Sequence, residues 1–202
     1  MIKLYGMPGT RSSRIQWVLE EANAPYELVL VNLLEGAHKK PEHLARHVHC
    51  LIPAYEEGSL KLIESAAMSM LIADRFPDAK LAPAVGTDAR ARYYELITYA
   101  VSTLDEHVIP AYLHTKVVPE AARDPKIVEH GKAVFAKSAE FLTKELGSNP
   151  YFLGAEFTAA DAVVGYDLIL AAQIGLLEGH PTLQAFVGRI VERPAFKKAM
   201  RR

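Results

Sequence analysis

The run from Ile52 to Ser65 constrains the fold of this 202-residue chain more than any other part. It is typical of two short strands joined by a tight turn at Glu57-Gly58-Ser59 and followed directly by a helix. Gly58 accepts the positive φ that a tight turn requires, and Pro53 suits the start of a strand, where no ladder donor is needed. The run therefore predicts a β-hairpin that leads straight into the N-terminus of a helix.

Two features of this run suit a small peptide ligand. A cis bond between Ile52 and Pro53 would bend the chain and turn the backbone N–H and C=O of Ile52 outward, free to pair with a peptide. Glu64 and Ser65 stand where the second strand meets the helix, whose free N–H groups and positive dipole end favour a carboxylate. A peptide edge beside a carboxylate site is what a tripeptide such as glutathione requires.

The order Ile52-Pro53-Ala54, a glycine-containing turn and Glu64-Ser65-Ala66-Ala67 resembles the glutathione-binding core of the glutathione S-transferase superfamily. The resemblance implies that the proline is cis and that the backbone of Ile52 pairs with the cysteinyl part of glutathione. It also implies that Glu64 and Ser65 hold the γ-glutamyl end.

The first part of the chain has an alternating pattern of strands and helices. Residues 2–5 form an apolar run, a helical pattern starts at Ser12 with one apolar face, and Tyr26 to Val31 is a second strand pattern. With the hairpin and the helix from Glu64, the order is β-α-β-α-β-β-α. The resemblance therefore implies an α/β thioredoxin-like domain at residues 1–78, a linker at 79–86 and an all-α domain at 87–202, the two-domain architecture of glutathione transferases.

The second part of the chain is predicted to be helical throughout. A long apolar repeat runs from Asp88 to about Leu113, in which Pro110 predicts a kink or an end. Thr158 and Asp161 form a capping box before an apolar helix that suits a buried central position. A capping box at this place also resembles the superfamily, so we interpret Asp161 as a fold determinant and not as a site residue.

The composition limits the classes of partner. The net charge of −1 indicates no surface for nucleic acid, and no apolar run reaches the length of roughly 18 residues that a membrane span needs. One cysteine, Cys50, excludes a disulfide within the chain. The N-terminal residues lack the apolar core of a signal peptide. We therefore expect a cytoplasmic protein without nucleic-acid or membrane partners.

The loop between the first strand and the first helix is the candidate catalytic segment. A free thiol has a pKa of about 8.5, so an enzyme that uses it must stabilise the thiolate. Aligning on Tyr5-Gly6 and Arg14 puts Thr10 in the place of the catalytic hydroxyl of serine-type members. The resemblance makes Thr10 the first candidate to hold the glutathione sulfur and Ser12 the second. Alternatively, the hydroxyls of this loop only cap the helix.

The segment before Pro53 carries one match to the superfamily and one departure from it. The stretch Gly36-Ala37-His38-Lys39 resembles a motif whose His and Lys approach the glycyl carboxylate of glutathione, so His38 and Lys39 are candidate binding residues. Leu51 stands where members usually have a polar residue that grips glutathione. His47, His49 and Cys50 are of metal-ligand type, but their spacing on an extended segment does not suit one tetrahedral ion, so no metal site is predicted.

The predicted function is a detoxifying glutathione transferase that conjugates the glutathione thiolate to a hydrophobic electrophile, with glutathione as co-substrate. The resemblance also implies a homodimer. Two alternatives stay open: a glutathione-dependent disulfide or peroxide reductase, since threonine at the thiol position also occurs among such members, and a non-catalytic binding module, which Leu51 favours. Retention on a glutathione column separates the last from the two enzymes.

Overall fold

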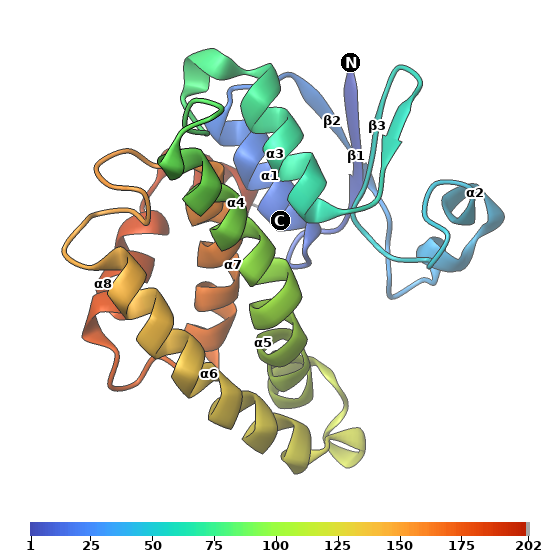
Figure 1. Cartoon of the computed structure of the whole chain (residues 1–202). Coiled ribbons are helices and arrows are strands. Elements are labelled where there is room, and N and C mark those ends of the chain that lie inside the picture. Colours follow the sequence, from blue (N-terminus) through green and yellow to red (C-terminus); the bar gives the residue numbers. More distant parts are fainter. Residues whose placement is uncertain (201–202) are drawn as a thin grey trace. The chain divides into compact units, whose positions relative to one another are not determined.

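A four-stranded sheet with the order β2-β1-β3-β4 forms the centre of the first of two units in the computed structural model, which describes residues 1–200 (Figure 1). Its strands are β1 (Ile2–Gly6), β2 (Tyr26–Leu30), β3 (Ala54–Glu57) and β4 (Leu60–Leu62). β1 and β2 are parallel, whereas β1 with β3 and β3 with β4 are antiparallel. The predicted hairpin is confirmed, and Gly58 in its turn has a φ of 60°.

The helices of this unit complete the predicted β-α-β-α-β-β-α order. They are α1 (Ser12–Glu21), α2 (Pro41–Leu44), α3 (Ser65–Arg75) and α9 (Pro194–Ala199), with 3₁₀ turns η1 (Ala37–Lys39) and η2 (Pro77–Ala79). Figure 1 shows α1 and α3 side by side along the strands, while α2 lies on the far side of β3 from them. The thioredoxin-like arrangement implied by the resemblance is therefore confirmed.

The two faces of the sheet are buried by different groups of residues. Leu4 and Tyr55 are partners in the β1–β3 register and both are fully buried. Because successive side chains of a strand point to opposite faces, Tyr5 belongs to the other face. There it forms a small core with Val31, Ile52 and Ala54, against which the partly buried Met7, Val29, Leu33 and Ala37 pack.

The last part of the chain returns to the first unit. Unit 1 comprises Met1–Ala82 together with the described residues from Glu192 onward, and unit 2 comprises Pro83–Val191. Helix α9 packs on α1 through a ring contact between Trp17 and Phe196, with centroids 5.0 Å apart. The side chain of Arg193 donates to both oxygens of Glu21 at 2.6 and 2.7 Å. This grouping differs from the sequence-based assignment of all of 87–202 to one domain, because α9 finds its packing partner on α1.

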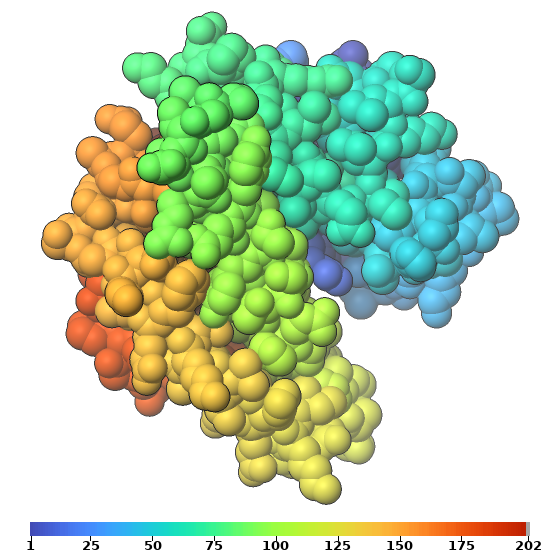
Figure 2. Space-filling view, viewed as in Figure 1, coloured from blue at the N-terminus to red at the C-terminus, as the bar shows by residue number. Residues whose placement is uncertain are grey.

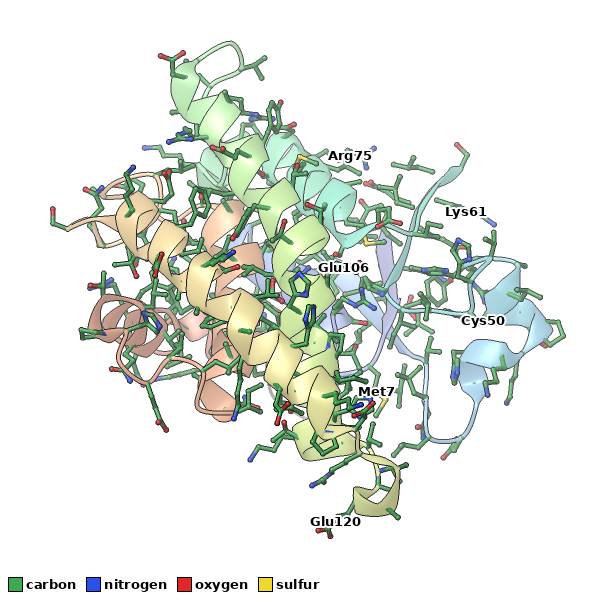
Figure 3. All side chains as sticks on the ribbon, turned by 60° about the horizontal axis from the view of Figure 1, so that its bottom comes forward. Met7, Cys50, Lys61, Arg75, Glu106 and Glu120 are labelled. Carbon is green, nitrogen blue, oxygen red and sulfur yellow. The ribbon has the colours of Figure 1, made fainter. Side chains whose placement is uncertain are left out.

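Unit 2 is helical, as predicted. Its helices are α4 (Asp88–Tyr99), α5 (Asp105–Tyr112), α6 (Pro125–Leu146), α7 (Ala159–Gln173) and α8 (Pro181–Ile190). The predicted long segment from Asp88 is continuous but contains two π-helical turns, η3 (Ala100–Leu104) and η4 (Leu113–Val117), and Pro110 lies inside α5. A 3₁₀ turn, η5 (Glu120–Ala122), precedes α6 at the end of the α5–α6 pair, where Figure 3 labels Glu120. The single helix expected from the sequence is thus divided by changes of hydrogen-bond pattern that apolar periodicity does not reveal.

The capping box of α7 is present as predicted. The carboxylate of Asp161 accepts hydrogen bonds from the backbone N–H of Phe152 and Thr158, both at 2.8 Å, and from the Thr158 hydroxyl at 2.9 Å. Asp161 is fully buried, and burial raises the pKa of its carboxyl to about 6. Most residues of α7 are buried, so this helix is the centre of unit 2. No helix among residues 1–200 is long and apolar enough to cross a membrane.

Candidate functional site

The loop from Met7 to Arg11 connects β1 to α1 and carries the first candidate hydroxyl. The Oγ1 atom of Thr10 lies 2.6 Å from the carbonyl oxygen of Met7 and 3.0 Å from the Oγ atom of Ser12. It also accepts a hydrogen bond of 3.3 Å from the backbone N–H of Ser12. Thr10 is only half-buried, so its hydroxyl stands at the start of α1 with part of its side chain accessible.

The two serines of this segment are buried and serve the loop. Ser12 is 1% exposed, and its hydroxyl accepts from the N–H of Met7 at 3.4 Å. Ser13 is fully buried and accepts from the N–H of Gly9 at 2.9 Å. The N-cap position is Arg11 and no side chain forms a cap hydrogen bond there, so neither serine caps α1. The serines bind N–H groups of the preceding loop instead.

Ser12 also fixes the closest approach between β1 and α1. A Cβ atom built on Gly6 would lie 2.3 Å from the Cβ and 2.4 Å from the Oγ of Ser12. Such distances are far below van der Waals contact, so only glycine fits at position 6 while Ser12 keeps its place. Ser12 is therefore a packed part of the loop, and Thr10 is the more accessible hydroxyl of the two.

Ile52 and Pro53 immediately precede β3. The bond between them is cis, as the resemblance implied. The β1–β3 register begins at Ala54, and within residues 1–200 no group forms a hydrogen bond with the backbone N–H or C=O of Ile52. The side chain of Ile52 is buried in the same small core that Met7 and Ala37 pack against. This core brings the Thr10 loop, the 3₁₀ turn η1 and the predicted peptide edge to one face of the sheet.

The turn η1 carries His38 and Lys39. Gly36 precedes it with a φ of 70°, a left-handed conformation that favours glycine. Lys39 is exposed, whereas His38 is half-buried, and its Nδ1 atom is buried without a hydrogen-bond partner within residues 1–200. A cation and an imidazole that lie beside the core around Ile52 suit a carboxylate at this position.

The N-terminus of α3 presents Glu64 and Ser65. Glu64 is the N-cap residue and is exposed, while Ser65 is 8% exposed. The fully buried guanidinium of Arg14 donates to the Ser65 hydroxyl at 3.4 Å. A buried cation beside the positive end of a helix dipole favours a nearby anion. Arg14 is thus a residue of this region that sequence reasoning used only as an alignment marker.

Three histidines lie in α2 and in the segment that follows it toward Ile52. The rings of His43 and His47 stack with centroids 6.3 Å apart, and the His49 ring meets His47 edge-on at 6.1 Å. His43 and His47 are 3% and 4% exposed. Burial lowers the pKa of His47, as do the neighbouring His43, His49 and Arg11, and Glu64 opposes the shift. These influences place His47 near charged residues of both the Thr10 loop and the α3 N-terminus.

The described residues of this region hold no metal cluster, and the two cavities reported below lie elsewhere. Among residues 1–200, no three His, Cys, Asp or Glu side chains are grouped so that they could hold a metal ion. Two cavities of about 330 and 320 Å³ are found in unit 2, one lined by residues of α6 and the turn after α7, the other lined by residues of α5 and α6. None of the predicted glutathione-site residues lines either cavity. The candidate site therefore depends on the groups described above.

Comparison with known proteins identifies the family. Residues 1–73 match the glutathione S-transferase N-terminal domain model, and residues 125–189 match the C-terminal domain model. The chain is also 31% identical over 210 residues to glutathione S-transferase 3 of Zea mays, covering 98% of this chain and 93% of the maize protein. The chain belongs to the glutathione S-transferase family. The predicted enzyme class, a glutathione transferase with glutathione as co-substrate, is thereby confirmed.

Solved structures of other glutathione transferases agree over the whole length. The crystal structure of glutathione transferase F7 from Populus trichocarpa is 27% identical, with a TM-score of 0.90 and complete coverage of both chains. A glutathione transferase homologue from Sulfitobacter, with bound glutathione, is 25% identical with a TM-score of 0.82, covering 98% of this chain and 96% of the other. The two-domain fold class predicted for this glutathione transferase is confirmed.

Proposed function

We propose that this glutathione transferase activates the glutathione thiol with the hydroxyl of Thr10 and conjugates the resulting thiolate to a hydrophobic electrophile. The supporting observation is the contrast between the two candidate hydroxyls. Thr10 is half-buried at the start of α1, whereas the Ser12 side chain is packed against Gly6 and is 1% exposed. Thr10 is therefore the hydroxyl that a ligand's sulfur reaches more easily.

The Thr10 hydroxyl must change its hydrogen bond when glutathione binds. Its single proton is directed to the Met7 carbonyl at 2.6 Å, and the Ser12 oxygen lies 3.0 Å away. Rotation of the Thr10 O–H toward the sulfur leaves its oxygen free to accept the Ser12 hydroxyl proton. A hydroxyl that accepts one hydrogen bond is a better donor in the next, and the N-terminus of α1 adds positive potential. Together these effects favour the thiolate over the thiol.

The rest of glutathione would lie along the face that carries Ile52. We assign the cysteinyl part to the backbone N–H and C=O of Ile52, beside Pro53, which have no partner within residues 1–200. The γ-glutamyl end would meet Glu64 and Ser65, with its carboxylate at the N-terminus of α3. The glycyl carboxylate would pair with the side chains of His38 and Lys39 in η1, which completes the predicted set of binding residues.

The thiolate then attacks the electrophile directly. A lone pair of the sulfur forms the new carbon–sulfur bond. In a substitution the leaving group departs with the electrons of the broken bond; in an addition the π electrons of the activated double bond move onto its activating group. We propose a hydrophobic electrophile as second substrate, a role in detoxification, a cytoplasmic location and a homodimer, as the family resemblance implies. The single cysteine, Cys50, is compatible with a reducing compartment.

Replacing Thr10 by valine tests the thiolate role, because valine keeps the shape but lacks the hydroxyl. A hydrogen bond to a charged group contributes about 1.5–3 kcal/mol, so kcat/KM should fall by roughly 10- to 100-fold. The pKa of bound glutathione, followed by the ultraviolet absorbance of the thiolate, should rise by about 1–2. Thr10→Ser should retain both properties, and glutathione affinity should change little.

Ser12→Ala is the matched control, since it removes the other hydroxyl of the loop. We expect a smaller loss in Ser12→Ala than in Thr10→Val. If Thr10→Val keeps full activity and the wild-type pKa of bound glutathione, while Ser12→Ala lowers the activity and raises that pKa, the role belongs to Ser12. A wild-type protein that reduces glutathione disulfides but forms no conjugates would favour the reductase alternative.

A further inference from the structure

The backbone of Leu51 is held by a buried imidazole. The Nε2 atom of His43 lies 2.7 Å from the carbonyl oxygen of Leu51. A carbonyl can only accept, so the hydrogen is on Nε2 and His43 is the neutral Nε2–H tautomer or the cation. His43 stands in α2, eight residues before Leu51, and thus connects α2 to the end of the segment that leads into β3.

This contact orients the backbone N–H of Ile52, which the proposed function assigns to glutathione binding. The Leu51 carbonyl and the Ile52 N–H belong to one peptide unit, which is planar. Among the described residues only the Ile52–Pro53 bond is cis, so the Leu51–Ile52 bond is trans and its C=O and N–H point in opposite directions. Fixing the carbonyl oxygen of Leu51 therefore fixes the direction of the Ile52 N–H.

The environment of His43 makes it a rigid support. Its side chain is 3% exposed and its ring stacks on that of His47, with an interplanar angle of 19°. His47 is itself held, because its Nδ1 accepts the N–H of His49 at 3.3 Å and its carbonyl accepts the N–H of Cys50 at 2.9 Å. Figure 3 labels Cys50 where the chain leaves the α2 segment toward β3.

The side chain of Leu51 takes no part in this arrangement. It is 48% exposed and apolar, so it donates no hydrogen bond to a peptide ligand. Figure 2 shows the light-blue segment with α2 at the outer edge of unit 1, where solvent reaches it. The orientation of the peptide edge must then come from the backbone, and His43 is the side chain that holds it.

We infer that His43 is a positioning residue for glutathione: through the Leu51 carbonyl it aims the N–H of Ile52 at the cysteinyl carbonyl of the tripeptide. This inference rests on the proposed function, because it assigns a cause to the orientation of one of its binding groups. His43 itself touches neither the sulfur nor the electrophile, so its effect is on binding and not on the chemical step.

Two substitutions at His43 separate orientation from packing. His43→Phe keeps a flat ring to stack on His47 but has no donor, whereas the amide of His43→Gln places an N–H near the position of Nε2. Isothermal titration with glutathione should give a dissociation constant roughly fivefold to tenfold higher for His43→Phe, as expected for the loss of one buried hydrogen bond. His43→Gln should bind within about twofold of wild type, and kcat at saturating glutathione should stay unchanged in both.

His49→Phe is the matched control, the same substitution at an exposed imidazole of the same segment, and should bind as wild type does. Amide NMR adds a local reading: glutathione should shift the Ile52 N–H strongly in wild type and weakly in His43→Phe. If His43→Phe stays folded and binds as tightly as wild type, or if it shows the wild-type shift at Ile52, the inference is overturned. Equal weakening in His43→Phe and His43→Gln would also overturn it. A wild-type protein that does not bind glutathione at all would remove the proposed function as well.

Discussion

Substituting Gly6 by alanine should destabilise unit 1 through a clash with the side chain of Ser12. The added Cβ would lie 2.3 Å from the Cβ of Ser12, whereas carbon atoms pack at about 3.5–4.0 Å. The Oγ of Ser12 would lie 2.4 Å away, whereas the Cα of Ser12 is already 3.7 Å away, and Gly6 does not have a positive φ. Alanine is therefore unfavourable at this position because of the Ser12 side chain and not because of the backbone.

The magnitude follows from the displacement that the clash requires. The two carbons must separate by about 1.2–1.7 Å, which a tightly packed strand–helix contact cannot provide without moving α1 or the Thr10 loop. Overpacking of this kind costs about 1–3 kcal/mol. Activity should fall as well. The Ser12 and Thr10 hydroxyls are hydrogen-bonded to each other, so displacing Ser12 also shifts the Thr10 hydroxyl that we propose binds the sulfur.

Urea unfolding followed by tryptophan fluorescence is a suitable assay, because Trp17 is the only tryptophan and is fully buried in α1 with Ser12. The decisive comparison is between two double variants. Ser12→Gly removes the clashing Cβ and should recover most of the stability lost in Gly6→Ala, with a coupling energy of about 1–2 kcal/mol. Ser12→Ala keeps the Cβ and should not. If both serine variants rescue equally, or neither does, the explanation by the Ser12 Cβ is refuted.

Two further predictions concern the capping box and acid stability. Asp161→Ala should lower the free energy of unfolding by about 2–4 kcal/mol at neutral pH, because two buried N–H groups lose their acceptor, partly offset by relief of the burial that raises the Asp161 pKa to about 6. Circular dichroism melting measures this, and a loss below about 1 kcal/mol would contradict the importance of the box. For His47, whose pKa is lowered in the folded protein from 6.5, the unfolded chain binds a proton first as pH falls, so stability declines below about pH 6.5. Urea titrations at about pH 7.5 and 5.5 should show a smaller decline in His47→Asn, and an equal decline would exclude His47 as the cause.

Features determined by neighbouring residues were predictable from the sequence. The hairpin followed from Pro53 and Gly58, since each of these residue types imposes its own backbone geometry. The capping box of α7 followed in the same way from Thr158 and Asp161, which are three positions apart. In each case the structure-forming interaction joins residues close in the chain, so a short pattern contains the information.

Features that join distant or non-periodic residues were not predictable. The ion pair between Arg193 and Glu21 spans 172 positions, and no local pattern indicates it. The burial of His43 and its bond to Leu51 lie in a polar segment without helical or strand periodicity, where a histidine has no signal of being inside. The proposed preference for Thr10 over Ser12 likewise depends on which side chain packs against its neighbours, a property that residue type alone does not contain.

The return of α9 to α1 has a consequence for the order of synthesis. A ribosome releases the four strands and α1 first, then all of residues 83–191, and only afterwards the helix Pro194–Ala199 that covers Trp17 and pairs with Glu21. During synthesis, the surface of α1 that later contacts α9 therefore stays uncovered until unit 2, more than half of the chain, has been made. Unit 1 can therefore complete its packing only after unit 2 has been synthesised, when α9 becomes available to bind α1.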